Sequence, residues 1–390
     1  MKRWPTKPLS DVAQVTAGDP APQRPEDFAE DGIPFVRMQD VGRLGQSTCL
    51  VETKDRLSQS ASTRLKRFPA GSILVPKSGA SIRLNHRAIL GIEAHVVSHL
   101  AVIVPRPLLN TRFAYYWLCG TDLSGVAHEA DLPSMKTSDL AKLQLPIPPL
   151  AEQERIVKLL DEADELRKLR IQGDRRTSSL IPALFHEMFG DPLGGEHKWP
   201  EVRFEEVTRR ITYGFTCPMK HFESGIPIIT AKNVLDGQID FQNVHYADSG
   251  EFSALTAKSK PERNDILITK DGTIGRCAVV AVDFPLCINQ SVALVQPKLD
   301  KVTPVFLSDY ILFPSVNAFL NGMGKGQALK HLQITELAKM PIPLPPMVLQ
   351  KEFAARVSEI RAVQAEQSVT RRRLDDLFQS MLHRAFKGEL

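Results

Sequence analysis

The sequence predicts a mixed α/β protein: two α/β domains in a pseudo-two-fold internal repeat, separated by two long antiparallel coiled-coil helices. Three observations predict it. Blocks of the first half recur in the second half at a nearly constant offset. Short strands rich in Val, Ile and Leu alternate with helical stretches in both halves. A proline-rich run in each half leads into a long amphipathic pattern.

The repeat covers both halves of the chain. Residues 72–79 (Ser-Ile-Leu-Val-Pro-Lys-Ser-Gly) correspond to 265–272 (Asp-Ile-Leu-Ile-Thr-Lys-Asp-Gly) at an offset of 193, and 146–149 correspond to 343–346 at 197. Further matches join 32–36 with 225–229, Ala101 with Ala293, and 139–142 with 336–339. A single offset that drifts by a few residues indicates a duplication with insertions in loops.

Each half begins with a globular part that mixes strands and helices. Turn residues bound the predicted strands, and Ser78-Gly79 and Asp271-Gly272 are typical of tight turns. Helical stretches are predicted over 112–119 and 305–321. The predicted strands are 33–38, 72–77, 96–104, 226–231, 265–270, 277–282 and 291–296.

A long helix follows each proline run, because proline ends the preceding element and cannot continue a sheet. The first helix is predicted from Ala151 to about Ser179, with Pro182 ending or kinking it. The second is predicted from Val348 to about Phe386, a length of about 58 Å. The apolar stripes are predicted at Ile156, Leu159, Ala163 and Leu166, at Phe353, Val357 and Ile360, and at Leu374, Leu377 and Met381.

Such long amphipathic helices must bury their stripes against a partner. The simplest partner is the counterpart helix from the other half, which a pseudo-two-fold axis makes antiparallel. The pair then holds two globular heads apart. The alternative, in which each helix folds back onto its own head, stays open.

Composition favours a soluble cytoplasmic protein that can bind nucleic acid. Lys+Arg 49 and Asp+Glu 45 give a net charge of +4, with a pI of about 8.7. This mildly basic balance permits a nucleic-acid partner without demanding one. Five scattered cysteines without a CxxC pair predict reduced thiols. We expect no signal peptide and no membrane partner, because no apolar run approaches the length of a span.

No motif for catalysis stands out. The sequence has no P-loop, no HExxH, no GxSxG and no zinc-spaced Cys/His set. One weak pattern, Asp40 with Glu52 and Lys54, resembles a Mg²⁺ site of some nucleases, but the second half has no such triplet. We therefore expect no catalytic residues, cofactor or metal in this chain. Lys270 is interpreted either as an exposed lysine at a turn or as a DNA-phosphate contact.

The junctions between heads and helices carry a family resemblance. Residues 140–153, 185–192, 340–350 and 377–390 resemble the helix starts, the exit from the first helix and the C-terminus of specificity subunits of type I restriction-modification systems. Asn289-Gln290-Ser291 and Lys330-His331 also match that family's recognition domains. The first half has Val97-Ser98-His99 and Pro133-Ser134 at these two places. This departure fits two heads that read different sequences.

The resemblance implies a division into target-recognition domain 1 at 1–150, a central spacer helix at 151–189, target-recognition domain 2 at 190–346, and a C-terminal spacer helix at 347–390. It implies sequence-specific binding to double-stranded DNA, with each head reading half of an asymmetric bipartite site. The helices would set the gap and dock two methyltransferase subunits. S-adenosylmethionine, ATP and Mg²⁺ are expected on partner subunits, with motor-nuclease subunits as further partners.

Physical chemistry narrows the candidate DNA contacts. Phosphates are bound by Lys, Arg and backbone N–H groups, and base edges by Arg, Lys, Asn, Gln, Ser and Thr. Loops that differ between the heads are the best places, above all the glycine-rich loop 322–327. The candidates are Lys77, Ser78, Ser81, Arg83, Asn85, His86, Lys136, Lys270, Thr273, Arg276, Asn289, Gln290, Lys325, Gln327, Lys330 and His331.

Two rival functions stay open at this point. One is a Mg²⁺-dependent nuclease that uses Asp40, Glu52 and Lys54. The other is a structural scaffold, in which the helices only dimerise and the heads bind protein. The nuclease predicts cleavage by the purified chain, and the scaffold predicts no salt-sensitive DNA binding.

Overall fold

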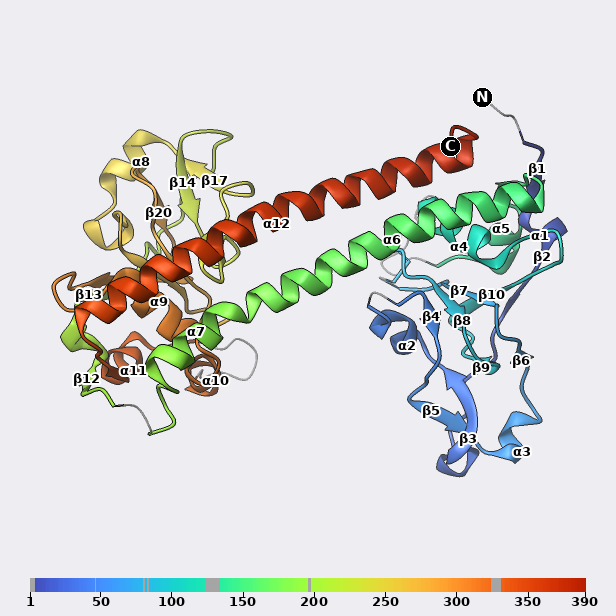
Figure 1. Cartoon of the computed structure of the whole chain (residues 1–390), viewed down its shortest axis with the longest axis horizontal. Helices are drawn as coiled ribbons and strands as arrows, with labels where there is room; N and C mark the ends of the chain where they lie inside the picture. Colours follow the sequence, from blue (N-terminus) through green and yellow to red (C-terminus); the bar gives the residue numbers. More distant parts are fainter. Residues whose placement is uncertain are drawn as a thin grey trace. The chain divides into compact units, whose positions relative to one another are not determined.

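The structure is a computed structural model that describes residues 4–45, 47–79, 81–82, 84–123, 134–195, 198–323 and 331–390 (Figure 1). The chain divides into two units. Unit 1 comprises Met1–Gln172 and Val369–Leu390, and unit 2 comprises Gly173–Ser368. Each unit therefore contains one globular head together with segments of both long helices. Among the described residues, no helix is both long and apolar enough to cross a membrane.

The head of unit 1 is built on two mainly antiparallel sheets. The first has the strand order β2-β10-β7-β8-β4, the second has β5-β3-β9-β6, and a small β1-β11 pair joins the two ends of the head. The strands are β1 (Thr6–Pro8), β2 (Ala13–Ala17), β3 (Phe28–Val36), β4 (Cys49–Leu50), β5 (Asp55–Leu57), β6 (Arg67–Phe68), β7 (Ile73–Pro76), β8 (Ala88–Leu90), β9 (Ala94–Val96), β10 (Leu100–Pro105) and β11 (Gln144–Pro146). The helices are α1 (Leu9–Val12), η1 (Pro25–Asp27), α2 (Met38–Arg43), α3 (Gln59–Ser62), α4 (Thr111–Gly120), α5 (Thr137–Ala141) and α6 (Leu150–Ser178).

The head of unit 2 has a similar plan. Its sheets have the orders β13-β21-β18-β19 and β17-β14-β20, with small β12-β22 and β15-β16 pairs. The strands are β12 (Glu201–Arg203), β13 (Thr208–Tyr213), β14 (Ile226–Ile229), β15 (Val234–Leu235), β16 (Gln238–Ile239), β17 (His245–Ala247), β18 (Ile266–Thr269), β19 (Cys277–Val279), β20 (Cys287–Ile288), β21 (Val292–Pro297) and β22 (Pro341–Pro343). The helices are α7 (Leu180–Phe189), η3 (Phe204–Val207), α8 (Ser249–Ala254), η4 (Ala257–Ser259), α9 (Pro304–Leu312), α10 (Pro314–Met323), α11 (Ile334–Lys339) and α12 (Met347–Lys387).

In unit 1 both long helices complete the core of the head, and in unit 2 α7 and α12 do so. In unit 1, Phe113 and Tyr116 of α4 contact Phe386 and Phe378 of α12 edge-on, with ring centroids 5.1 and 6.1 Å apart. Ile156 of α6 is fully buried in the same cluster. In unit 2, the aromatic rings of α7, α9 and the start of α12 form a corresponding cluster of Phe185, Phe189, Phe306 and Phe353. Both alternatives are therefore partly right: the helix segments pack on a head and on each other.

The helix segments run in opposite directions within each unit. In unit 1, Arg167 of α6 donates to Asp375 of α12 over 2.8 Å. Arg155, about three turns earlier on α6, donates to the carbonyl of Leu390, just beyond the end of α12. In unit 2, Gln364 of α12 donates to the carbonyl of Thr177 over 3.1 Å. As residue numbers rise along α6, the residue numbers of the contacted positions on α12 fall, so the segments are antiparallel.

Several expectations about elements need correction. The predicted strand 96–104 is two strands, β9 and β10, because residues 97–99 form a turn. The predicted helix 305–321 is broken into α9 and α10 at Pro314, which begins the second helix. The end of the predicted strand 33–38 is wrong, since Met38 begins α2. The helix break near Pro182 is confirmed, at Ser179.

The buried stripes also differ from the prediction. Leu166 and Leu377 are 54% and 51% exposed. On α12 the predicted residues Phe353 and Val357 are buried, whereas nearer its C-terminus the buried residues are Phe378, Leu382 and Ala385, one position beyond most of the predicted stripe there. Each helix packs against a head as well as against the other helix. Its buried face is therefore the one that lies between these two neighbours.

A buried glutamine closes each junction between head and helix. Gln153 accepts from the N–H of Asn110 over 2.8 Å and donates to the carbonyls of Leu108 and Pro148. Gln350 makes the same set of contacts in unit 2: it accepts from Thr303 over 2.8 Å and donates to Lys301 and Pro345. Asn110 and Thr303 cap α4 and α9. Each glutamine thus ties the start of a long helix to the cap of its head's helix.

In unit 2 a buried ion pair joins α9 to α12. Asp309 is almost fully buried and accepts from Arg361 over 2.7 Å, while its Oδ2 atom has no hydrogen-bond partner among the described residues. Burial raises the pKa of Asp309 to about 6, although Arg361 acts in the opposite direction. Desolvation therefore outweighs the ion pair here.

The glutamine contacts predict local destabilisation on substitution. Gln153→Leu strands two carbonyls and one N–H group, each at a cost of about 1–3 kcal/mol when buried. We expect faster amide hydrogen exchange over residues 108–113 only, and Gln350→Leu is expected to act only over 301–306. The control is Gln379→Leu, at an exposed position of α12. Equal exchange in all three variants would contradict the proposed role of these glutamines.

The raised pKa of Asp309 predicts a pH-dependent stability of unit 2. Between about pH 4 and 6 the folded unit holds a proton that the unfolded chain has released, so this group lowers the free energy of unfolding as pH rises through that window. We expect Asp309→Asn to remove a decrease of about 2–3 kcal/mol from the pH profile of urea unfolding. Asp300→Asn, at an exposed position, is the control. An unchanged profile in Asp309→Asn refutes the prediction.

Candidate nucleic-acid interface

The two predicted turns are built by the same backbone hydrogen bonds. In head 1 the N–H of Lys77 donates to His99 over 3.0 Å, and its carbonyl accepts from Met135 over 2.9 Å. In head 2 the N–H of Lys270 donates to Ser291 over 3.0 Å, and its carbonyl accepts from Leu332 over 2.8 Å. These partners correspond at the offsets found in the sequence. The turns are therefore one scaffold used twice.

Both turns project into open space. Gly79 and Gly272 have φ angles of +76° and +79°, which favour glycine, and a Cβ atom on either would meet nothing within 4 Å. The next backbone bridge is also shared, since Ser78 pairs with Ser134 as Asp271 pairs with His331.

The side chains on this shared scaffold differ between the heads. In head 1, Ser78 and His99 share a hydrogen bond of 3.0 Å. In head 2, Asp271 accepts from the ammonium group of Lys270 over 2.8 Å and lies 2.7 Å from Nδ1 of His331. Both turns carry a lysine, Lys77 or Lys270, but the next residue is the hydroxyl residue Ser78 in head 1 and the carboxylate Asp271 in head 2.

Two predicted contacts are occupied inside the protein. Asn85 has a φ of +52°, donates to the carbonyl of Cys119 over 2.8 Å and accepts from Arg87. Asn289 accepts from the N–H of Ser291 over 3.2 Å and from its hydroxyl over 2.6 Å. Both amides hold loops in place. The Asn-x-Ser spacing was a signal for the second, because Asn side chains often accept from the backbone two residues later.

The other predicted residues vary in exposure. Lys136, Thr273, Gln290 and His331 are exposed, and the half-buried ones are Lys77, Ser78, Ser81, His86, Lys270 and Arg276. Arg83, Lys325, Gln327 and Lys330 lie outside the described residues, as does most of the glycine-rich loop 322–327. The scaffold thus brings together Lys77, Ser78 and the neighbourhood of Lys136 in head 1, and Lys270 and His331 in head 2.

One aromatic residue near the second turn was not among the contacts predicted from the sequence. Tyr213, at the end of β13, is 36% exposed. The ammonium groups of Lys258 and Lys270 lie over its ring, 5.7 and 5.3 Å from the centroid. The internal repeat held the signal, since Tyr213 pairs with Ala293 just as Ala17 pairs with Ala101. Head 1 has a methyl group where head 2 has a phenol.

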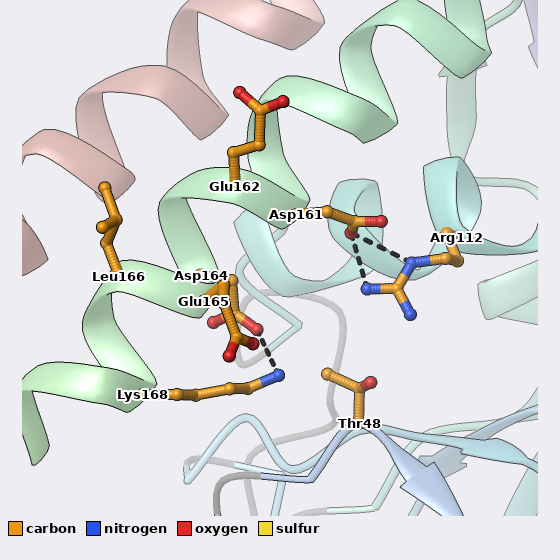
Figure 2. Close-up of a pocket in the computed structure, with 8 residues that line it drawn as sticks. All are labelled: Thr48, Arg112, Asp161, Glu162, Asp164, Glu165, Leu166 and Lys168. Atoms are coloured by element: carbon orange, nitrogen blue, oxygen red, sulfur yellow. Dashed lines mark hydrogen bonds and ion pairs between the residues drawn. The ribbon is translucent and has the colours of Figure 1, made fainter. Parts of the chain in front are cut away.

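A groove of about 670 Å³ in unit 1 has the opposite electrostatic character (Figure 2). Glu162 and Glu165 on α6 are exposed at its edge, and Leu166 adds an apolar side chain. Thr48 of head 1 lies on the side of the groove towards which Glu165 and Lys168 point in Figure 2. The lining has four carboxylates against the two cations Arg112 and Lys168, so the groove is unfavourable for phosphates.

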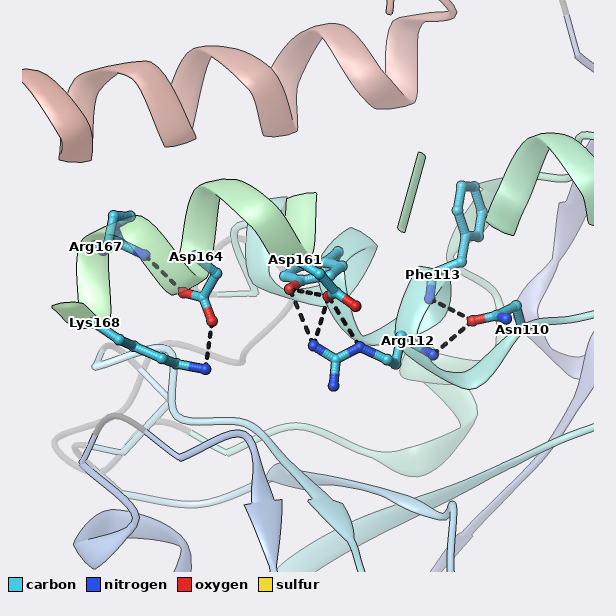
Figure 3. Close-up of polar contacts among 8 residues, drawn as sticks. Asn110, Arg112, Phe113, Asp161, Asp164, Arg167 and Lys168 are labelled. Atoms are coloured by element: carbon cyan, nitrogen blue, oxygen red, sulfur yellow. Dashed lines mark hydrogen bonds and ion pairs between the residues drawn. The ribbon is translucent and has the colours of Figure 1, made fainter. Parts of the chain in front are cut away.

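The wall of the groove contains a polar junction between head 1 and α6 (Figure 3). Asp161 accepts from Nε of Arg112 over 3.0 Å and from the hydroxyl of Tyr116 over 2.6 Å, and Asp164 pairs with Lys168 over 2.7 Å. Burial, and next the hydrogen bond to Asp161, raises the pKa of Tyr116 well above its ordinary range. These charges neutralise one another and orient α4 on α6.

The residues of the rival nuclease have other surroundings. Asp40 is 9% exposed and accepts from the N–H of Arg37 over 2.7 Å, as the capping residue in the first turn of α2. Glu52 and Lys54 are exposed. Among the described residues, no three His, Cys, Asp or Glu side chains come together as a metal site would require. Asp40 has a structural explanation that requires no metal.

Comparisons with known proteins agree on one family. The model of the type I restriction modification DNA specificity domain matches residues 1–173 and 212–370. The chain is 25% identical to the EcoBI specificity subunit of Escherichia coli, over 99% of this chain and 86% of that one. It is 22% identical to the EcoKI specificity subunit of Escherichia coli strain K12, over 99% and 89%. These relatives are named type I restriction enzyme specificity subunits.

Solved structures show the same fold. A chain from work on complex assembly and conformational transition of the type I R-M system matches with a TM-score of 0.59 and 20% identity, over 100% of this chain and 99% of that one. The S subunit of a type I system from M. genitalium matches with a TM-score of 0.54 and 14% identity, over 98% and 96%. The chain belongs to the type I restriction-modification DNA specificity family, as a non-catalytic specificity subunit.

Proposed function

We propose that this subunit reads an asymmetric, two-part site on double-stranded DNA, with one half read by each target-recognition domain. The domains are 1–150 and 190–346, and the spacer helices 151–189 and 347–390 set the gap. The observation that carries the proposal is the shared turn scaffold. Lys77 and Lys270 have equivalent backbone hydrogen bonds, yet the side chains around them differ. Two turns with the same backbone and different hydrogen-bonding side chains are suited to two different DNA half-sites.

The candidate contacts are proposed as a set in each head. In head 1 they are Lys77, Ser78, Ser81, Arg83, Asn85, His86 and Lys136. In head 2 they are Lys270, Thr273, Arg276, Asn289, Gln290, Lys325, Gln327, Lys330 and His331. Within these sets Asn85 and Asn289 act by fixing loop shape, because their side-chain oxygens are already occupied. The exposed residues Lys136, Thr273, Gln290 and His331 are the strongest candidates for direct contact.

The spacer proposal rests on the helix contacts inside each unit. Arg167–Asp375 and Gln364–Thr177 give the two helices opposite directions on both sides of their midpoints. The apolar clusters then fix each head to a pair of helix segments. An antiparallel coiled coil of this kind has a pseudo-two-fold axis and a defined length, so the gap between half-sites is a property of the helices.

The subunit carries no chemistry of its own in this proposal. Two methyltransferase subunits dock on the helices and heads, bind S-adenosylmethionine and methylate the site, and flipping the target base is their task. Motor-nuclease subunits, with ATP and Mg²⁺, complete a restriction form in the cytoplasm. The work on assembly of the type I R-M system, from which one structural neighbour comes, supports a multisubunit complex.

Selection from random duplex DNA tests the two-part site. The complex of this chain with its methyltransferase partner is expected to enrich a non-palindromic motif with two defined parts and a fixed gap. Replacing the head 2 residues Thr273 and Gln290 together by Ala is expected to relax only one part, because each head reads its own half. Failure of the intact complex to enrich any motif would reduce the helices to a scaffold.

Shortening both helices tests the spacer. We propose deleting residues 170–176 from α6 and 365–371 from α12, between the contacts Arg167–Asp375 and Gln364–Thr177. Seven residues remove about 10 Å of helix, or about three base pairs of duplex at 3.4 Å per base pair, and nearly preserve the apolar register. The selected motif is expected to keep both parts and lose about three base pairs from the gap. An unchanged gap would show that something other than the helices sets it. A seven-residue deletion in α6 alone is the control, since unpaired shortening breaks the register.

A further inference from the structure

The exposed phenol ring of Tyr213 collects more positive charge than its neighbours neutralise. Lys258, in η4, and Lys270, after β18, both place their ammonium groups over the ring. Their distances to the centroid keep the two nitrogens within about 11 Å of each other. Asp271 contacts Lys270, and His331 also contacts its Oδ1 atom, whereas neither of these two ion pairs involves Lys258. An anion near Tyr213 would be attracted by both ammonium groups.

The ring gives these lysines a fixed position. A lysine ammonium over an aromatic face is attracted by the ring quadrupole, at about 0.5–1 kcal/mol for an exposed site. Lys258 is exposed, and a free lysine side chain would otherwise sample many rotamers. Contact with Tyr213 removes part of that freedom before any ligand binds. The cost of ordering the side chain on binding is then smaller.

Comparison of the two heads shows that Tyr213 is not needed for the fold they share. β2 and β13 pair with their neighbours in the same register, and each is followed by a glycine, Gly18 or Gly214. A Cβ atom on these glycines would lie 2.0 and 1.9 Å from the carbonyl oxygens of Val96 and Ile288, so the backbones are equally close-packed. The position before the glycine is Ala17 in head 1 and Tyr213 in head 2. The fold thus does not need the phenol.

The ring also belongs to the surface around the shared turn. Lys270 is the residue whose backbone hydrogen bonds build that turn, and its side chain, with 15% exposed, is already held by Asp271 and Tyr213. The ammonium group of Lys270 is therefore held in a mostly buried position, whereas that of Lys258 is on the exposed side. The arrangement suits a phosphate, because ammonium groups bind phosphate as point charges without base preference.

We propose that Tyr213 is a positioning residue that holds Lys258 and Lys270 together as a contact for a DNA phosphate, specific to the second head. This inference rests on the proposed DNA-binding function. It adds two residues, Tyr213 and Lys258, that motif reasoning did not select. Tyr213 acts through the lysines, so its role predicts that any aromatic ring at this position suffices.

The experiment measures equilibrium binding of the methyltransferase complex to a duplex with the selected site and to a scrambled duplex, between 50 and 200 mM salt. Lys258→Gln is expected to weaken both duplexes to a similar extent, and to reduce the slope of log K against log salt by about 0.9. Tyr213→Leu is expected to give at least that reduction, and Tyr213→Phe to match the wild type. Adding Lys258→Gln to Tyr213→Leu is expected to cause no further loss.

Controls separate this inference from the function on which it rests. Lys301→Gln removes an equal charge beyond the other end of β21 and is expected to leave the slope unchanged. Wild-type complex that binds no duplex in a salt-sensitive manner refutes the proposed function itself. Wild-type binding with an unchanged slope in Lys258→Gln refutes the phosphate contact alone, and this variant stays informative if Tyr213→Leu does not fold. Loss of binding in Tyr213→Phe, or additive losses in the double variant, refutes the positioning role.

Discussion

The packing of helix segments into the core of each head is the constraint on which the rest of the structure depends; the segments belong to α6 and α12 in unit 1 and to α7 and α12 in unit 2. Phe378 and Phe386 of α12 complete the cluster that begins with Phe113 and Tyr116 of α4. In unit 2, Phe353 of the same helix fills the corresponding place. Large aromatic side chains contribute most of the buried area in such clusters, and truncating one costs about 3–5 kcal/mol. These clusters therefore fix the position of each head on its helix segments. The buried glutamines fix the loops before α4 and α9.

The repeat conserves this frame while its polar contacts diverge. Tyr116 and Asp309 occupy equivalent positions on α4 and α9. Tyr116 donates to Asp161 of α6, whereas Asp309 accepts from Arg361 of α12. The direction of the hydrogen bond and the sign of the helix residue are both reversed. At the offset of 197, Arg361 corresponds to Asp164 of α6, so a head transferred to the opposite helix would place Asp309 beside a second carboxylate. The duplicated halves have thus become specific to their own helix segments.

Much of this arrangement could be predicted from the sequence, since it depends on local patterns. Proline runs and heptad-like spacing located both long helices to within one or two residues. The offset between halves identified the two turns, which the structure joins by equivalent hydrogen bonds. What failed depends on three-dimensional partners. Leu166 is exposed because α6 turns towards a head, and no periodicity in one helix contains that information. Asn85 stays a candidate, but the sequence could not show that its side chain holds a loop, because its carbonyl partner, Cys119, lies 34 residues away. Tyr213 was accessible to sequence reasoning through its alignment with Ala17, but only after the strand register was known.

Charge is distributed locally, which bears on how DNA is held. The net charge of +4 is too small for strong non-specific binding by the chain as a whole. Glu162 and Glu165 at the groove on α6 repel phosphates, while Lys258 and Lys270 gather positive charge at one turn of head 2. Under the proposed function, each head supplies only part of the affinity, because each phosphate contact contributes about one released counterion. The effective concentration of the second head at its half-site is then set by the helices that connect it to the first. On this proposal, the length of the helix pair contributes to sequence specificity alongside the base contacts.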